Sequence, residues 1–186
     1  MQRHFGIVIA FILTISVLAS AQMGGPDKSK RPSPPAQANC KFADGKTMAV
    51  DYSSPRAKGR KIFGSKDEKA LVPYGEVWRT GANEATTLTT TAATTVDGKD
   101  VPEGSYTLFT IPNSGKWTLI ISKQTGEWGI PYPGEKSDLA RVDMKVANPP
   151  SAVENFTIDF DQMGDSCTMH VNWADSGASV QFAEKK

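Results

Sequence analysis

The segment SYTLFTIPNSGKWTLIIS, residues 105–122, decides the fold class. Its two apolar runs, residues 105–111 and 117–122, are rich in aromatic and β-branched side chains, which favour strands. Between them lie Asn113, Ser114 and Gly115, residue types that favour turns. The segment therefore predicts two successive strands of an antiparallel meander.

Similar short runs extend from this segment toward both ends of the chain. Cys167, Met169, Val171 and Trp173 share one strand phase, and polar side chains occupy the alternate positions. No segment of ten or more residues has a convincing helical period. We therefore predict an all-β fold of about nine short strands. A two-sheet antiparallel β-sandwich of the immunoglobulin-like or jelly-roll-like kind fits best, with a barrel as the alternative.

The first residues have the pattern of a secretory signal peptide. Arg3 precedes a fourteen-residue apolar run at residues 5–18, which is short for a permanent membrane span. Small residues at 19–21 fit a cleavage site after Ala21. We expect an exported protein, periplasmic or secreted, without a stable membrane span after cleavage.

The predicted organisation of the chain has three parts. Residues 1–21 form the signal peptide, and residues 22–38, rich in Pro, Gly, Ser and Lys, are predicted to be a disordered tether. Residues 39–186 form a single domain of ordinary size. Cleavage would leave 20 basic and 20 acidic residues. Such a balance argues against a nucleic-acid partner.

Two cysteines, Cys40 and Cys167, both lie in the inward phase of their strands. In an oxidising compartment a disulfide between them would be ordinary. The alternative is two separate buried thiols that act as small hydrophobic side chains.

Known catalytic and metal-binding motifs are not found in the sequence. The mature chain would contain one histidine, His170, and three Cys and His residues in all. That number is too small for a structural zinc site, and no G-x-S-x-G motif marks a nucleophile. We therefore predict no metal or cofactor and assign no enzyme class.

The segment YGEVWRTGANEATT, residues 74–87, contains the strongest candidate for a site. An arginine can grip a carboxylate or phosphate with two parallel hydrogen bonds, and a tryptophan offers a flat apolar wall. The candidate ligand-binding residues are Arg56, Lys58, Arg60, Trp78, Arg79, Asn83, Glu84 and Trp128. The structural alternative is that Trp78 fills the core and Arg79 pairs with Glu84 or Glu76.

Four stretches resemble a family of exported bacterial proteins that is catalogued only as a domain of unknown function. They are SSPRAKGRKIFG (53–64), PYGEVWRTGANEATT (73–87), GKDVPEGSYTLFTIP (98–112) and WTLIISKQTGEWG (117–129). The resemblance covers about residues 38–160 and implies an exported β-rich domain. It carries no catalytic residue over to this chain.

These observations favour a module that binds a small anionic or sugar-like ligand, or a protein of the cell envelope. The alternative is a hydrolase that acts on a glycan or peptide with Glu84 as general acid or base. Such an enzyme would need a second carboxylate nearby, such as Glu76 or Asp138. A purely structural envelope protein is the third possibility.

Overall fold

The computed structural model describes residues 27–186. The predicted signal peptide, its cleavage site after Ala21 and the first part of the predicted tether lie outside the described residues. Among the residues described, no helix has the length and apolar character needed to cross a membrane.

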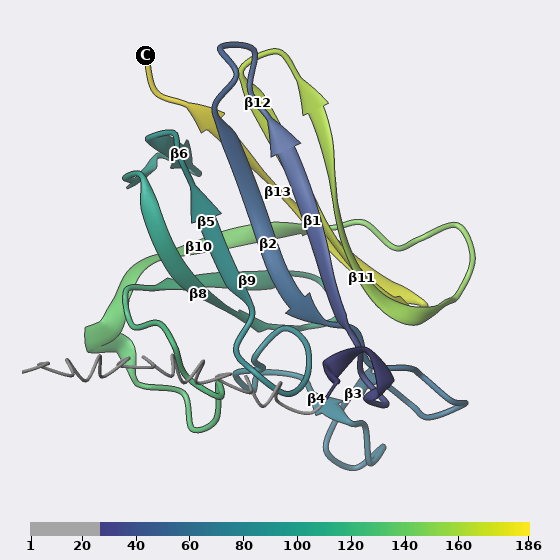
Figure 1. Cartoon of the computed structure of the whole chain (residues 1–186). Coiled ribbons are helices and arrows are strands. Elements are labelled where there is room, and N and C mark those ends of the chain that lie inside the picture. The colour runs from purple at the N-terminus through teal and green to yellow at the C-terminus, as the bar shows by residue number, and fades with distance from the viewer. Residues whose placement is uncertain (1–26) are drawn as a thin grey trace, which may run out of the picture.

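The protein is built of β-strands, nine of which follow one another across a large antiparallel sheet (Figure 1). In spatial order they are β1 (Pro35–Lys41), β2 (Thr47–Ser53), β5 (Thr87–Thr90), β8 (Gly104–Ile111), β9 (Trp117–Ser122), β10 (Asp138–Val146), β13 (Ser176–Glu184), β12 (Ser166–Ala174) and β11 (Val153–Met163). The hairpin of β6 (Thr94–Val96) and β7 (Lys99–Val101) joins this sheet through β13. A separate parallel pair is formed by β3 (Phe63–Gly64) and β4 (Val72–Pro73), and two short 3-10 turns are η1 (Lys28–Lys30) and η2 (Glu135–Ser137).

The large sheet curls until it is nearly closed into a barrel. β10 causes the curl, because it pairs with β9 through Asp138–Met144 and with β13 through Lys145 and Val146. At the far ends of the strand order, β1 and β11 lie against each other (Figure 1). The all-β antiparallel prediction is therefore confirmed. The architecture is closer to the barrel alternative than to two separate stacked sheets.

The first strand begins within the segment that the composition predicted to be a tether. β1 starts at Pro35, inside the range 22–38 that we expected to be a disordered tether. A proline is tolerated at the first position of an edge strand, where its missing N–H breaks no ladder bond. Here Pro35 lies opposite Ser53 in the β1–β2 ladder.

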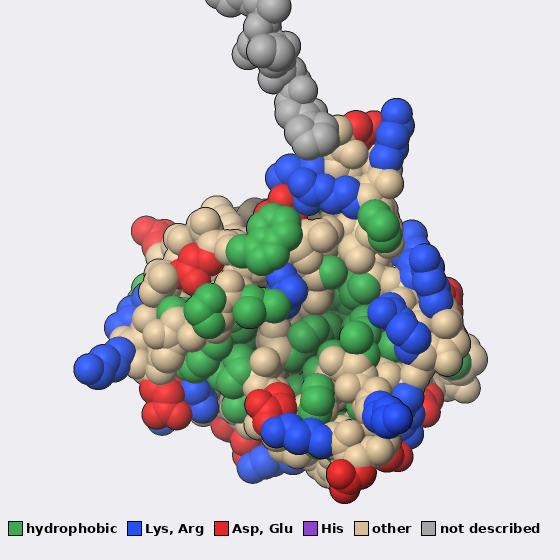
Figure 2. Space-filling view, turned by 90° about the horizontal axis from the view of Figure 1, so that it is seen from below, with side chains coloured by type: hydrophobic (Ala, Val, Ile, Leu, Met, Phe, Trp, Pro, Cys, Tyr) green, Lys and Arg blue, Asp and Glu red, His purple; other side chains and the backbone are tan. Residues whose placement is uncertain are grey.

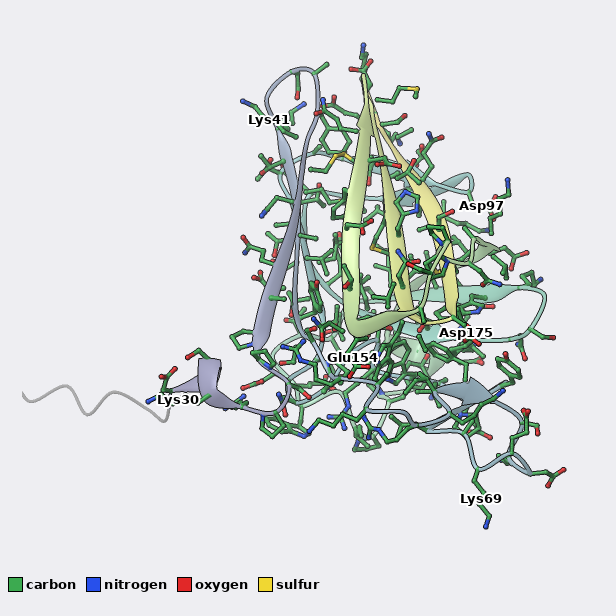
Figure 3. All side chains as sticks on the ribbon, turned by 90° about the vertical axis from the view of Figure 1, so that its right-hand side faces the viewer. Lys30, Lys41, Lys69, Asp97, Glu154 and Asp175 are labelled. Atoms are coloured by element: carbon green, nitrogen blue, oxygen red, sulfur yellow. A yellow bond between two sulfur atoms is a disulfide. The ribbon has the colours of Figure 1, made fainter. Side chains whose placement is uncertain are left out.

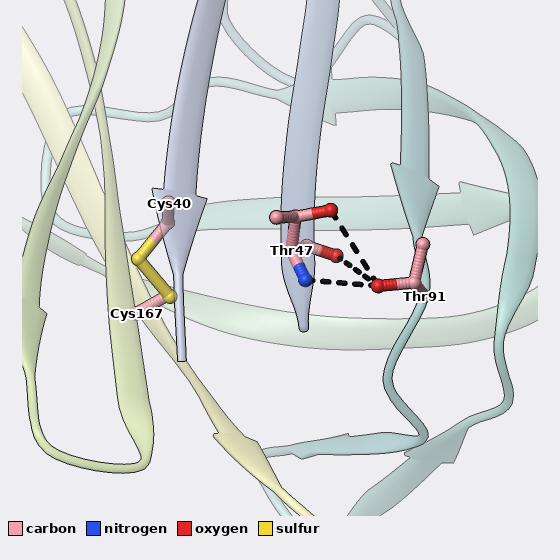
Figure 4. The surroundings of a disulfide bond; sticks show 4 residues. All are labelled: Cys40, Thr47, Thr91 and Cys167. Atoms are coloured by element: carbon pink, nitrogen blue, oxygen red, sulfur yellow. Dashed lines mark hydrogen bonds between the residues drawn. A yellow bond between two sulfur atoms is a disulfide. The ribbon is translucent and has the colours of Figure 1, made fainter. Parts of the chain in front are cut away.

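The predicted disulfide between Cys40 and Cys167 is present. It joins β1 to β12 across the seam where the sheet nearly closes (Figure 4). Cys167 is completely buried and Cys40 is nearly so, as the inward strand phase required. The hydroxyl of Tyr52 adds a second link across this seam, because it accepts a hydrogen bond of 3.1 Å from the N–H of Ile158.

A cluster of aromatic rings fills one end of the core. Trp78 stacks on Trp173 with ring centroids 5.8 Å apart, and Phe156 meets Trp78 edge-on at 5.1 Å. Phe63 of β3 packs on Trp117 at 4.8 Å. Figure 3 places Lys30 and Lys69 toward this end of the molecule and Lys41 toward the other. The aromatic cluster supports the loops that form the candidate site.

Candidate functional site

A cleft of about 610 Å³ opens at the aromatic end of the barrel. Its walls combine aromatic and aliphatic side chains with four cations. The residues that line it are Pro32, Ser33, Pro55, Arg56, Lys58, Arg60, Leu71, Val72, Val77, Trp78, Arg79, Gly81, Ala82, Gly129, Ile130, Tyr132 and Trp173. Figure 2 views this end and shows hydrophobic side chains gathered in a hollowed area, with Lys and Arg side chains around it.

An unusual backbone holds Arg79 in the cleft wall. Thr80, Gly81 and Asn83 have φ angles of 56°, 150° and 55°. A positive φ is especially unfavourable for a β-branched residue such as Thr80. The Thr80 hydroxyl donates to that of Thr110 at 3.1 Å, and the Thr86 hydroxyl donates to the Thr80 carbonyl at 2.7 Å. These buried bonds hold the loop in a conformation that is rare outside functional sites and tight turns.

The guanidinium of Arg79 is fixed by main-chain carbonyls. Its Nη1 donates to the carbonyl of Asn83 at 2.7 Å and to that of Trp128 at 3.2 Å. Burial lowers the pKa of Arg79 below its usual value, because partial desolvation disfavours the charged form. The two carbonyls orient this charge but do not neutralise it.

The four cations of the cleft have no acidic partners among residues 27–186. None of Arg56, Lys58, Arg60 and Arg79 forms a salt bridge there, although twelve Lys or Arg salt bridges occur elsewhere among these residues. Glu154 accepts a hydrogen bond from the main-chain N–H of Lys58, not from its ammonium group. No Asp or Glu lines the cleft among the described residues. The cleft is therefore strongly cationic and open to an anion.

The rim of the cleft is unusually apolar for an exposed surface. Leu71, Val77 and Ile130 line it, with exposed fractions of 47%, 36% and 60%. Trp128, which is 53% exposed, immediately precedes the lining residue Gly129. Concentrated exposed apolar surface next to a cleft is typical of a binding site.

The structure brings together five of the eight candidate residues. Three of these come from the basic segment, Arg56, Lys58 and Arg60, and two from the aromatic segment, Trp78 and Arg79.

The other three candidates, Asn83, Glu84 and Trp128, do not line the cleft. Asn83 and Trp128 act through their main-chain carbonyls, which hold Arg79. The Asn83 side chain donates to the carbonyl of Ser33 at 2.8 Å. That bond ties the N-terminal segment to the wall of the cleft.

Glu84 anchors the same N-terminal segment. Its carboxylate accepts two hydrogen bonds from Nη1 of Arg31, at 2.8 and 2.9 Å, and pairs with Lys28 at 3.1 Å. The bonds from Arg31, with smaller contributions from its own N–H and Lys28, lower the pKa of Glu84 to about 2. Glu84 and Asn83 together form a clasp on the N-terminal segment, which holds Pro32 and Ser33 in the wall of the cleft.

This environment does not favour Glu84 as a general acid or base. A carboxyl that stays ionised above pH 2 is a poor proton donor near neutral pH. Its two suggested partners are engaged elsewhere. Glu76 pairs with Lys66 at 2.6 Å, and Asp138 accepts bonds of 2.6 Å from both Tyr132 and Arg141.

We expect Glu84→Gln to weaken the clasp in a pH-dependent way. Because the pKa of the folded state lies below the usual value of 4.5, the pairing stabilises the protein above pH 4.5. That contribution is lost as the pH falls toward 2. Glu84 is 38% exposed, so solvent screening limits the effect to about 1 kcal/mol.

The measurement is the difference in melting temperature between the parent protein and Glu84→Gln across pH 2–7. It should be largest at pH 5–7 and vanish near pH 2. Amide exchange at Arg31 should also rise in the variant. Glu76→Gln, which removes a surface pair that does not touch the N-terminal segment, is the matched control. An unchanged exchange rate at Arg31 would show that Glu84 does not hold the segment.

Sequence reasoning missed several lining residues. Tyr132 is held by a network in which its hydroxyl donates to Asp138 and accepts a 2.8 Å hydrogen bond from Arg141. Trp173 forms part of the buried wall, and its indole N–H has no acceptor among the described residues. The inward phase of β12 placed Trp173 in the core, but no local signal linked it to Trp78.

Within residues 27–186, no group of three or more His, Cys, Asp or Glu side chains could hold a metal ion.

Gly129 permits the close approach that positions Arg79. A Cβ atom at residue 129 would lie 3.1 Å from Cβ of Arg79 and 3.3 Å from Ala85. Gly126 has nearly the same φ, 80° against 81°, but has nothing within 4 Å of the position of its Cβ. Both substitutions by alanine incur the strain of a positive φ, about 1 kcal/mol. Only Gly129→Ala also pushes against Arg79.

We therefore expect Gly129→Ala to lower the free energy of unfolding by about 1 kcal/mol more than Gly126→Ala does. Chemical denaturation of the two variants measures this difference. Equal losses would mean that the loop holding Arg79 adapts without cost.

Comparison with known proteins identifies one family. A family model described as "Protein of unknown function (DUF2911)" matches residues 33–182. No curated protein and no solved structure matches the chain.

Proposed function

The chain belongs to the DUF2911 family of proteins of unknown function, and we propose that its cleft binds a small amphipathic anion. The ligand would have an apolar body and at least one acidic group. The observation that carries this proposal is the set of four cations that line an apolar cleft without an acidic partner among residues 27–186.

Charge supports an anion over a neutral ligand. Like charges that share one cleft repel one another. None of the four cations forms a salt bridge with a carboxylate among residues 27–186. An anionic ligand would remove the repulsion and gain charge-assisted hydrogen bonds. A neutral sugar would leave the four charges uncompensated, so we favour the anionic ligand over the sugar-like one.

Size and apolar lining support a small molecule with a hydrophobic body. Ligand pockets commonly enclose about 300–1,000 Å³ and are lined mainly by apolar and aromatic side chains. The cleft, at about 610 Å³, falls within that range. Trp78 and Tyr132 offer ring surface inside it, and Leu71 and Ile130 extend apolar surface to the rim.

The arrangement supports binding more than hydrolysis. Glu84 lies outside the cleft in two ion pairs, and no second carboxylate lines the cleft in the described part of the chain. A purely structural protein would have no need for unpaired cations around an apolar hollow.

We also propose that the protein works outside the cytoplasm, periplasmic or secreted. The disulfide is compatible with an oxidising compartment, and the pattern of residues 1–21 is that of a signal peptide.

Two dyes that share a skeleton test the proposal. 8-Anilinonaphthalene-1-sulfonate carries a sulfonate, and N-phenyl-1-naphthylamine is the same molecule without it. Titration of the purified protein should show one site that prefers the sulfonate by about tenfold, a preference that falls as salt is added. Equal affinity for the two dyes, or no saturable binding, would contradict the proposal.

Variants locate the site. The double variant Arg56→Gln/Arg60→Gln should lower the affinity for the anionic dye several-fold, because it removes two of the four cations. The affinity for the neutral dye should stay unchanged within about twofold. Lys116→Gln makes the same kind of charge change at a surface pair with Asp143, outside the cleft lining, and should affect neither dye. If the double variant no longer binds either dye, the cleft has collapsed and the result does not report on the anion site.

A further inference from the structure

The hydrogen bonds of Arg79 occupy one end of its guanidinium and leave the other end without an acceptor. Nη1 carries two N–H groups, and both find carbonyls, those of Asn83 and Trp128. Nε and Nη2 have no acceptor among residues 27–186. The three remaining N–H groups therefore form a free edge.

That free edge has a specific chemical preference. The N–H groups of Nε and Nη2 lie parallel in one plane, and they match two oxygens of a carboxylate, phosphate or sulfonate. A lysine at the same position would place a point charge there without the parallel pair. The free edge thus selects an oxyanion that presents two oxygens.

The guanidinium is fixed before any ligand arrives. Its two carbonyl partners come from different loops, one following Arg79 in sequence and one between β9 and β10. Gly129 packs against the stem of Arg79, and the positive-φ backbone at Thr80 sets the direction of the chain. A fixed side chain loses less conformational entropy on binding than a mobile one.

The other three cations are held differently. Lys58 and Arg60 are exposed. In Arg60, Nε and Nη2 donate hydrogen bonds to the carbonyls of Ala57 and Arg56, so the edge that is free in Arg79 is occupied. Arg56 contacts the hydroxyl of Ser54 at 3.4 Å through Nη1. Nε and Nη2 of Arg56 also have no acceptor among residues 27–186, but Arg56 is held by one contact of 3.4 Å, whereas two carbonyls from different loops hold Arg79. Lys58 and Arg60 contribute charge to the cleft.

We propose that Arg79 is the oxyanion subsite of the cleft, where the acidic group of the ligand accepts hydrogen bonds from Nε and Nη2 while its apolar body lies against Trp78. The natural ligand is then an apolar or aromatic molecule with a carboxylate or a phosphate. This inference rests on the proposed function and adds to it the residue that recognises the acid.

A set of naphthalene ligands tests the subsite. 1-Naphthoate and 1-naphthamide have nearly the same shape, but only the first presents two anionic oxygens. Calorimetric titration of the purified protein should give a preference for the acid of about tenfold. In Arg79→Lys the charge is kept and the fork is lost, so this preference should fall to about twofold or less.

The affinity for 1-naphthamide reports whether the cleft is intact. It should change by no more than about twofold in Arg79→Lys, since the amide does not depend on the fork. 1-Naphthyl phosphate should lose affinity in the same variant, and comparison of the two acids in the parent protein tells which acidic group fits the subsite better. Lys116→Gln, with its change outside the cleft, is the control.

The outcomes separate this inference from the proposed function. If the parent protein does not prefer the acid over the amide, the proposed function fails. If it does, and Arg79→Lys keeps the full preference, only the Arg79 subsite is overturned. If Arg79→Lys loses affinity for the acid and the amide equally, Arg79 shapes the cleft and does not bind the oxyanion. That result also overturns the inference.

Discussion

Replacement of Trp78 by alanine should lower the free energy of unfolding by about 3–5 kcal/mol. The ring packs against Phe63, Phe156 and Trp173, with centroid distances of 5.6, 5.1 and 5.8 Å. Trp78 is itself partly buried, and its removal would take contacts away from three buried rings and widen the cleft. The main chain of Trp78 also exchanges hydrogen bonds of 2.8 and 2.9 Å with Thr110, so local disorder would spread to β8.

Trp128→Ala is the matched control for this substitution. The same residue type is removed from the same end of the molecule, but the side chain is largely exposed and has no ring partner among the described residues. We expect a loss of no more than about 0.5 kcal/mol, as for ordinary surface substitutions. Chemical denaturation of both variants gives the comparison. Similar losses would mean that the packing of Trp78 against the three rings does not stabilise the fold.

Removal of the disulfide should have an effect of similar size. The bond closes a loop with a sequence separation of 127 residues, for which loss of loop-closure entropy in the unfolded chain predicts about 5 kcal/mol. It also fastens the seam at which β1 and β11 lie against each other, where the backbone ladder does not close the sheet. The double variant Cys40→Ala/Cys167→Ala should therefore unfold at much lower denaturant concentration.

Reductant provides the control for the disulfide. Dithiothreitol should destabilise the parent protein and leave the double variant unchanged. A loss below about 1 kcal/mol in the double variant would show that packing and hydrogen bonds hold the barrel seam without the disulfide.

The strands could be predicted because their signals are local. Alternation at residues 167–173 reappears as the alternating burial of β12, and residues 105–111 and 117–122 form β8 and β9 within one residue. Strand phase predicted that both cysteines face inward, and the expected oxidising compartment favoured the disulfide over two separate thiols. The sequence could not decide between the sandwich and the barrel alternative, because the near closure depends on β10 pairing with two strands that are far apart in sequence.

The site could be predicted only in part, for a similar reason. The basic segment and the segment of Trp78 and Arg79 share the cleft. Asn83 and Glu84 lie only a few residues further along, yet they point to the N-terminal segment. The positive φ angles of Thr80, Gly81 and Asn83 turn the chain, and sequence adjacency does not reveal such a turn. Tyr132 and Trp173 come from distant segments, and no sequence signal linked them to the cleft.

The central claim is that an amphipathic anion binds in the cleft, with its acidic group at Arg79. Its most direct test is the ¹H–¹⁵N NMR spectrum of the protein during titration with 8-anilinonaphthalene-1-sulfonate. We expect saturable shifts of the Trp78 indole N–H and the Arg79 Nε–H, with no shift of Met163, which is not among the lining residues. Shifts confined to other surfaces, with the Trp78 and Arg79 signals unmoved at saturation, would contradict the claim.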